Sequence, residues 1–434
     1  MELHQLYQLD AVRQRMREYL GAVAGRPPTA LFVSRCDRGS YQQIEPLPVA
    51  ELDRLLERGQ DAARSLWDRA ALLAHLDVEY VNFDFPGEPF LDPVRAFYLQ
   101  EPVRLAAERV LAAHRLRPLW LLSGRGYHLI WQVPRHSQAF ALLAGIGRVP
   151  EHLLARYARP QPPAGAAIGP DTARAYAGLG MVMEHLARSI QRLARPHSAM
   201  PVELTAQRVA PQQVGREMIS IDVSEYADPL DRRMIRLPFS AYRKPWENGS
   251  IRDVETRQRI PLMVMVPLDG ETPWPGLAAR RFLEPAADLA QRTSTRIPDQ
   301  AVATERLLGD YTRSRLARFH RDFYARQQQP PERWPQTYDR FSPASLPAEA
   351  RPALEQANDQ LLKPERLRAL VRAMLQLGWH PRDVAGLIRS KYERDHGWGG
   401  EWYTYDAATR ADFYTRLFAG GDGDSGREAR GARP

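Results

Sequence analysis

The segment LDVEYVNFD, residues 76 to 84, is the feature that most constrains this chain. It reads as an apolar β-strand with two carboxylates, Asp77 and Glu79, separated by one residue. Side chains alternate between the faces of a strand, so both acids leave the same face of the predicted sheet, while Val78 and Tyr80 face the other way. Carboxylate pairs of this kind bind Mg²⁺ or Mn²⁺ beside substrate phosphates, although an exposed acidic strand face has the same pattern.

A second informative segment follows about 45 residues later. Residues 119–122 and 127–133 predict two strands joined by a Ser-Gly-Arg-Gly turn at 123–126. The two glycines allow backbone N–H groups to converge on an anion, and Arg125 and His128 add side-chain donors. A glycine-rich turn or a strand histidine is usually structural, but their coincidence with the acidic pair favours a phosphate site.

The third segment runs from residue 219 to 246. Asp222 ends an apolar strand-like run, and Arg236, Ser240 and Lys244 follow it. The chain has three lysines among its 60 Lys and Arg residues. Retention of Lys244 in this segment therefore suggests a need for a compact, mobile ammonium group.

In this order, the three segments resemble motifs I, II and III of the archaeo-eukaryotic primase superfamily, which includes primase small subunits and primase-polymerases. The strings that carry the resemblance are Asp-Val-Glu-Tyr, Ser-Gly-Arg-Gly-Tyr-His and Arg-Leu-Pro-Phe-Ser, within roughly residues 70 to 250. The resemblance implies an α+β fold: a primase-type catalytic core with an RNA-recognition-like mixed sheet, followed by a helical C-terminal domain.

The resemblance also implies roles for single residues. The implied ligands of catalytic Mg²⁺ or Mn²⁺ are Asp77, Glu79 and Asp222. The implied contacts to the nucleotide's triphosphate are Ser123, Arg125, His128, Arg236, Ser240 and Lys244. Two points depart from the family pattern. Tyr242 stands where the family often has a histidine, and the nearby Asp228 and Asp231 leave the identity of the third carboxylate open.

The implied function is template-directed nucleotidyl transfer, as in a DNA primase or primase-polymerase. The partners would be single-stranded or primed DNA, ribo- or deoxyribonucleoside triphosphates, and proteins of a replication or defence system. Two alternatives remain: a metal-dependent nuclease or phosphodiesterase, and a non-catalytic nucleic-acid-binding protein with a degenerate primase fold. The triphosphate-like cradle argues against the first, and the retained acids argue against the second.

Composition agrees with a polyanionic partner. The 434 residues carry a formal net charge of +8, with a pI near 9.6. The single cysteine, Cys36, excludes a disulfide framework and a cysteine-rich zinc module. No signal-like or membrane-spanning apolar run is evident, so we expect a cytoplasmic protein without a membrane partner.

The predicted organisation has four parts. A catalytic domain is expected at 1–275, a helical connector and linker at 276–347, a helical C-terminal domain at 348–419 and a disordered tail at 420–434. Residues 49–74 are expected to be helical. Residues 364–394 predict a helix-turn-helix-like pair, whose residues Arg382, Arg389, Lys391 and Arg394 are candidates for phosphate contacts. A plain helical hairpin is the alternative for this pair.

Overall fold

The structure is a computed structural model that describes residues 1–23, 26–35, 46–205, 216–247, 251–355, 363–394 and 405–420. It divides into two compact units. Unit 1 comprises residues 1–147, 151–223 and 230–308, and unit 2 comprises 148–150, 224–229 and the chain from 309 on. Cys36 lies outside the described residues, as does the expected disordered tail beyond Gly420.

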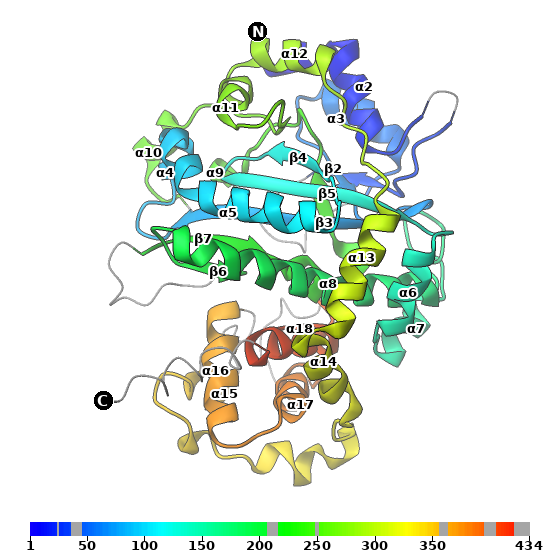
Figure 1. The fold of residues 1–434 in the computed structure, drawn as a ribbon, viewed down its shortest axis with the longest axis vertical. Coiled ribbons are helices and arrows are strands. Elements are labelled where there is room, and N and C mark those ends of the chain that lie inside the picture. The colour runs from blue at the N-terminus through cyan, green and yellow to red at the C-terminus, as the bar shows by residue number, and fades with distance from the viewer. Residues whose placement is uncertain are drawn as a thin grey trace. The chain divides into compact units, whose positions relative to one another are not determined.

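Unit 1 is built on a six-stranded sheet of order β6-β7-β3-β5-β4-β9 (Figure 1). Its strands are β3 (Ala71–Asn82), β4 (Leu119–Leu122), β5 (Gly126–Pro134), β6 (Val202–Leu204), β7 (Glu217–Asp222) and β9 (Val266–Pro267). β3 pairs antiparallel with β5 on one side and β7 on the other, and β6 pairs parallel with β7. The protein is thus mixed α+β, and the acidic strand lies in the middle of the sheet.

The central strands are connected as β3-α5-β4-β5-α8-β7 and lie in the order β7-β3-β5-β4. This is the split βαβ arrangement of a βαββαβ unit. The crossover helices are α5 (Pro93–Ala113) and α8 (Pro170–Ala194), and the short helices α6 (Gln138–Ile146) and α7 (Glu151–Tyr157) precede α8. Two antiparallel neighbours of β3 therefore come from segments far apart in the sequence.

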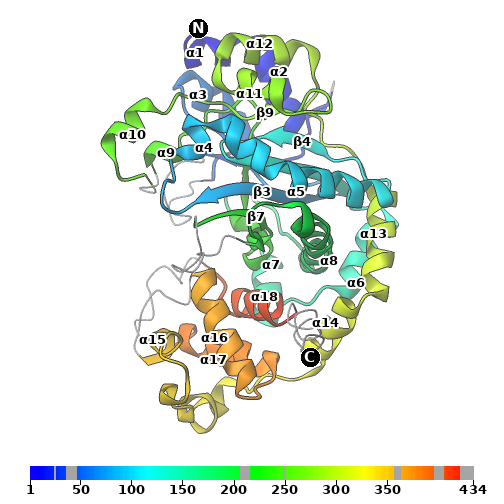
Figure 2. The ribbon, with the colours of Figure 1, turned by 60° about the vertical axis from the view of Figure 1, so that its left-hand side comes forward.

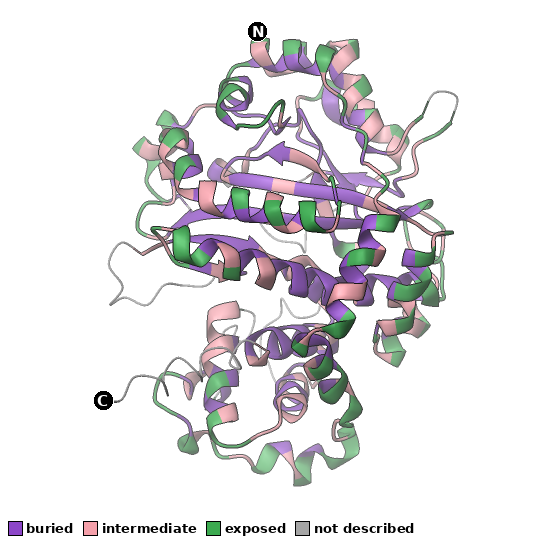
Figure 3. Ribbon diagram, viewed as in Figure 1, coloured by how far each residue is buried: buried purple, intermediate pink, exposed green. Residues whose placement is uncertain are grey.

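Helices α5 and α8 pack against each other and against β3, and both lie in front of the sheet in Figure 1. Their inner sides and the central strands are buried, whereas the outer side of α5 is largely exposed (Figure 3). Phe97 of α5 contacts Tyr127 of β5, which pairs with Val78. Since Val78 faces the helices, Asp77 and Glu79 lie on the opposite face.

A second, smaller sheet corrects one prediction. Helix α3 (Leu52–Glu57) ends early, and Gly59 adopts a positive φ of 62° just beyond it, a common helix ending. The chain then forms β2 (Ala63–Ser65), which pairs with β1 (Val33–Ser34) and β8 (Met234–Arg236). The expected helix over 49–74 is therefore wrong beyond residue 57.

The remaining helices of unit 1 surround these two sheets. They are α1 (Leu3–Gln8), α2 (Asp10–Tyr19), α4 (Glu88–Leu91), α9 (Lys244–Glu247), α10 (Val254–Arg259), α11 (Trp274–Arg281) and α12 (Leu283–Arg292). Helices α11 and α12, expected in a connector, belong to unit 1, and the division between the units falls inside α13 (Ala301–Arg313). No described helix is long and apolar enough to cross a bilayer.

Unit 2 is helical. Its helices are α14 (Arg315–Ala325), α15 (Pro352–Glu355), α16 (Pro364–Gln376), α17 (Pro381–Tyr392) and α18 (Ala407–Ala419). The predicted pair at 364–394 is present as α16 and α17, and both pack against α18 (Figure 2). Within the expected connector and linker at 276–347, residues 327–347 contain three short 3-10 helices, and Trp334 and Tyr338 are buried.

The basic side chains of α17 contact acids within unit 2. Arg394 forms two 2.6 Å hydrogen bonds to Asp339, whose carboxylate is also 3.5 Å from Lys391. Arg389 pairs with Glu393 at 2.6 Å. The fourth pair joins Arg382 to Asp412. The candidate phosphate contacts of this helix are thus engaged in intramolecular ion pairs.

We therefore expect the double variant Lys391→Ala/Arg394→Ala to leave the salt dependence of binding to the predicted DNA partner nearly unchanged. Removal of a cation that binds a phosphate would reduce the log–log slope by about 0.7 for single strands. Affinity for labelled single-stranded DNA should be measured at several salt concentrations. A slope shallower by more than about 1 would show that this helix does bind phosphates.

Candidate active site

Asp77, Asp222 and His128 lie at the same level of three adjacent strands. In the β3–β7 ladder Asp77 is opposite Asp222, and in the β3–β5 ladder it is opposite His128. Directly opposed residues share a face of the sheet, with Cβ atoms about 4.5–5.5 Å apart. Glu79 is one pleat further along β3, opposite Gly126 and Ser220. The three sequence segments therefore converge on one patch of the sheet.

Glu79 is surrounded by positive charge. Its carboxylate accepts a charge-assisted hydrogen bond from Arg125, and Lys244 Nζ is 4.0 Å from its other oxygen. Burial would raise the pKa of Glu79, but the charges of Arg125 and Lys244 outweigh it and lower that pKa to about 2. Glu79 is thus ionised at neutral pH, and two expected nucleotide contacts converge on it.

Asp77 has the opposite environment. Burial, and then the like charges of Glu79 and Asp222, raise the pKa of Asp77 well above its ordinary value. Its Oδ1 atom accepts no hydrogen bond from the residues that the structure describes, and His128 Nε2 is 3.7 Å away. Negative charge at this position is therefore incompletely compensated by the protein.

His128 is held by a second histidine. Its Nδ1 atom is 3.0 Å from Nε2 of His75, a buried residue of β3. Burial, followed by the charge of His75, lowers the pKa of His128 well below its ordinary value. A neutral His128 whose Nδ1 accepts from His75 would present an Nε2–H donor on the side of Asp77. No local signal in the sequence singles out His75.

The chemistry of these acids fits a hard divalent cation, which takes oxygen ligands. The uncompensated Oδ1 of Asp77 and the raised pKa of this carboxyl are the features that a cation would relieve. The described residues contain no group of three or more His, Cys, Asp or Glu side chains close enough to hold a metal ion. Glu79 is turned to Arg125 instead, so a cation would compete with Arg125 for this carboxylate.

Arg236 and Ser240 lie in a buried network beside this patch. Arg236 donates to Asp61 at 2.9 Å and to the carbonyl of Ala241, and its guanidinium stacks 4.8 Å from the ring centre of Tyr242. Ser240 accepts a 2.7 Å hydrogen bond from the N–H of Ala62. Both side chains, expected to contact the nucleotide, thus join the segment 219–246 to the loop before β2.

Tyr242, which departs from the pattern of the family that the sequence resembles, packs on the Ser123–Gly126 turn. A Cβ atom at Gly124 would lie 2.5 Å from its ring, so only glycine fits there without a shift of the ring. The same ring carries Arg236 on it. Tyr242 therefore connects the Ser123–Gly126 turn to Arg236 through packing.

The geometry also bears on the third carboxylate. Asp222 faces Asp77 across the β3–β7 ladder. Asp228 pairs with Arg410 at 2.9 Å, within unit 2. Asp231 forms an ion pair with Arg156 of α7. Of the three candidates, Asp222 is the one that lies beside the acidic pair.

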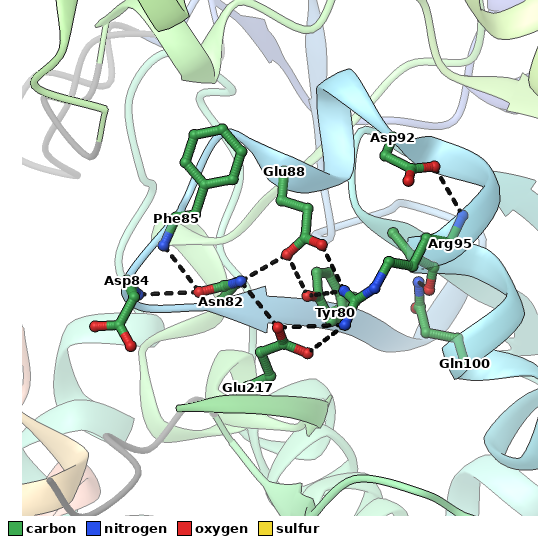
Figure 4. A network of polar contacts seen from close by, with 10 residues as sticks. Tyr80, Asn82, Asp84, Phe85, Glu88, Asp92, Arg95, Gln100 and Glu217 are labelled. Atoms are coloured by element: carbon green, nitrogen blue, oxygen red, sulfur yellow. Dashed lines mark hydrogen bonds and ion pairs between the residues drawn. The ribbon is translucent and has the colours of Figure 1, made fainter. Parts of the chain in front are cut away.

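A polar network on β3 just beyond the acids ties α5 and β7 to this strand (Figure 4). Arg95 contacts Glu88 at 2.5 Å and Glu217 at 2.9 Å. Tyr80 and Asn82 both donate to Glu88 at 2.6 Å, and Asn82 also donates to Glu217 at 3.2 Å. These contacts support the register that places Asp222 opposite Asp77. The network was not predicted from the sequence, because its members come from four separate elements.

Comparison with known proteins yields no relative. No protein-family model matches this chain, and neither a curated protein nor a solved structure matches it significantly.

The ion pairs of Glu79 allow a ligand-binding test that does not depend on catalytic activity. We expect Glu79→Gln to strengthen binding of inorganic triphosphate in the absence of divalent cations, because Arg125 and Lys244 lose their carboxylate partner. The gain should be at least about fivefold, since a unit charge at 4 Å contributes roughly 1 kcal/mol even in water. Calorimetric titration measures the affinity of each variant for inorganic triphosphate. Glu101→Gln, which removes a carboxylate paired with Arg104, is the control. Equal affinities for Glu79→Gln and wild type would contradict the assignment of Arg125 to phosphate.

Proposed function

We propose that this chain is a template-directed nucleotidyltransferase of the primase or primase-polymerase type, with a primase-type catalytic core in unit 1. One observation carries the proposal: Asp77, Asp222 and His128 are register partners on three adjacent strands, with Glu79, Arg125 and Lys244 beside them. The three motif-like segments are therefore neighbours in space as well as ordered in sequence. The βαββαβ connection of the sheet also supports an RNA-recognition-like core.

In the proposed reaction, the oxygen of a primer 3′-hydroxyl, or of an initiating nucleotide's 3′-hydroxyl, forms a bond to the α-phosphorus of a nucleoside triphosphate. The bond from this phosphorus to the bridging oxygen breaks, pyrophosphate leaves, and the hydroxyl proton passes to solvent. Asp77, Glu79 and Asp222 would hold Mg²⁺ or Mn²⁺, which lowers the pKa of the hydroxyl and neutralises the leaving group when bound.

The chain's own cations position the phosphates. Arg125 forms a hydrogen-bonded ion pair with Glu79, and Lys244 lies 4.0 Å from the same carboxylate; both cations would instead contact phosphate oxygens of the bound nucleotide. His128 would donate from Nε2 to the same group. We assign Arg236 and Ser240 to support of this cradle through their buried contacts with the loop before β2. The basic net charge of +8 suits a DNA template as partner.

The decisive experiment supplies the full chain with a primed and an unprimed DNA template, labelled ribo- and deoxyribonucleotides, and Mg²⁺ or Mn²⁺. We expect template-dependent incorporation that requires a divalent cation. Cleavage of the labelled strand would favour a nuclease instead. Binding without incorporation or cleavage under every condition would favour a non-catalytic nucleic-acid-binding protein.

A further inference from the structure

Arg280, a residue of α11 outside all three motif-like segments, is a buried cation. Its side chain is 1% exposed. No carboxylate forms an ion pair with it in the part of the chain that the structure describes. Burial lowers its pKa to about 10, which still leaves the guanidinium charged at neutral pH. An isolated buried charge is costly, so a specific contact or ligand is expected to compensate for it.

The contacts of Arg280 lead directly to the turn of motif II. Its Nη1 atom donates to the carbonyl of Ser123 at 2.6 Å and to the carbonyl of Gly124 at 2.8 Å. The guanidinium also stacks 5.1 Å from the ring centre of Phe97 on α5. One side chain therefore fixes two successive peptide groups of the turn against the helical layer.

The other two carbonyls of the turn are also occupied. The carbonyl of Arg125 accepts from Gln100 Nε2 at 2.9 Å and from the N–H of Tyr80 at 3.1 Å. The carbonyl of Gly126 accepts from the N–H of Ser123 at 2.8 Å. All four acceptors of the turn are thus directed to donors of the protein itself.

The backbone N–H groups of the turn form fewer hydrogen bonds than its carbonyls do. The N–H of Arg125 makes only a long 3.4 Å contact with Ser123 Oγ. The N–H of Gly124 donates no hydrogen bond to the residues that the structure describes. A turn with occupied carbonyls and available N–H groups is the backbone arrangement that binds anions, and a cation behind it strengthens this preference.

We propose that Arg280 is a positioning residue for the nucleotide's phosphates: it holds the carbonyls of the Ser123–Gly126 turn inward and supplies positive charge behind the N–H groups that bind the anion. The inference rests on the proposed function and extends it to a residue that no motif contains. In the bound state the phosphate supplies a counter-charge for Arg280.

The test measures binding of inorganic triphosphate and of an unphosphorylated nucleoside to the full chain, by calorimetry, for wild type and for Arg280→Lys, Arg280→Gln and Arg280→Met. Arg281→Met is the matched control, because Arg281 is the next residue of α11 and is exposed. We expect triphosphate affinity to fall in the order Arg, Lys, Gln, Met, with a loss of about 10–100-fold for Met, as for other groups that orient a ligand-binding group. Nucleoside affinity should not change.

The lysine in Arg280→Lys keeps the positive charge, and the glutamine in Arg280→Gln keeps a hydrogen-bond donor without the charge. Comparison of these two variants therefore tests the role of Arg280 even if Arg280→Met does not fold. In extension assays the Lys and Gln variants should raise the nucleotide KM with little change in kcat. Wild-type triphosphate affinity in folded Lys and Gln variants would overturn the role of Arg280 and leave the proposed function intact. Wild-type protein that binds neither triphosphate nor nucleotides would overturn both.

Discussion

Asp77→Asn is expected to abolish nucleotide incorporation while stabilising the fold. The variant loses a carboxylate that would bind the cation, which should cost more than the roughly 10–100-fold loss seen when only an orienting group is removed. It also removes a partly buried carboxyl group whose negative charge Glu79 and Asp222 repel, so the free energy of unfolding should rise. Single-turnover extension and urea denaturation measure the two effects.

The matched control is Asp84→Asn, since Asp84 is an exposed acid just after the same strand and pairs with Arg216. It should retain extension and show little change in stability. Near-normal extension by folded Asp77→Asn would disprove the assignment of this carboxylate to catalysis. Loss of both activity and stability would indicate that Asp77 serves the fold instead.

Arg236→Met is expected to destabilise unit 1 by about 3–5 kcal/mol, the usual cost of removing one partner from a buried ion pair. Asp61, which is 0% exposed, would be left charged without its 2.9 Å partner, and Tyr242 would lose the guanidinium stacked on it. Urea denaturation followed by tryptophan fluorescence measures this loss. The double variant Asp61→Asn/Arg236→Met should recover part of it.

Lys244→Met is the control for Arg236→Met. Lys244 is an expected phosphate contact in the same segment, but its side chain is partly exposed. Its stability should change by no more than about 0.5 kcal/mol, while its nucleotide affinity falls. If Arg236→Met is as stable as wild type and loses nucleotide affinity, Arg236 contacts the ligand directly, as the family resemblance implies.

The strands of the site could be predicted because their signals are local. Apolar runs bounded by turn residues located β4 at Leu119–Leu122 and placed β5 within one residue at each end. The alternation along β3 put Asp77 and Glu79 on one face, and the predicted helix pair at 364–394 is present as α16 and α17. Each of these inferences needs only neighbouring residues.

The missed features depend on distant partners. Leu66 and Trp67 read as a continuation of an amphipathic helix, but the chain forms β2 because β8, from residues 234–236, pairs with it. Arg236 looked available for phosphate because Asp61, its partner, lies far earlier in the sequence. His75 and Arg280 join the site only through tertiary contacts with His128 and the turn. Of these features, only the early end of α3 had a local signal, the helix-ending Gly59.

The position of β3 in the middle of the sheet has a consequence for how this protein is made. Its acids acquire their partners only when β5 and β7 have been synthesised, and the Ser123–Gly126 turn is fixed only after residue 280 has been added. Such high contact order slows folding, because long chain segments must close before their contacts form. During translation, the edge of β3 that pairs with β7 stays exposed until residue 222 has been synthesised. An unpaired strand edge promotes aggregation, so a chaperone would protect β3 during this interval.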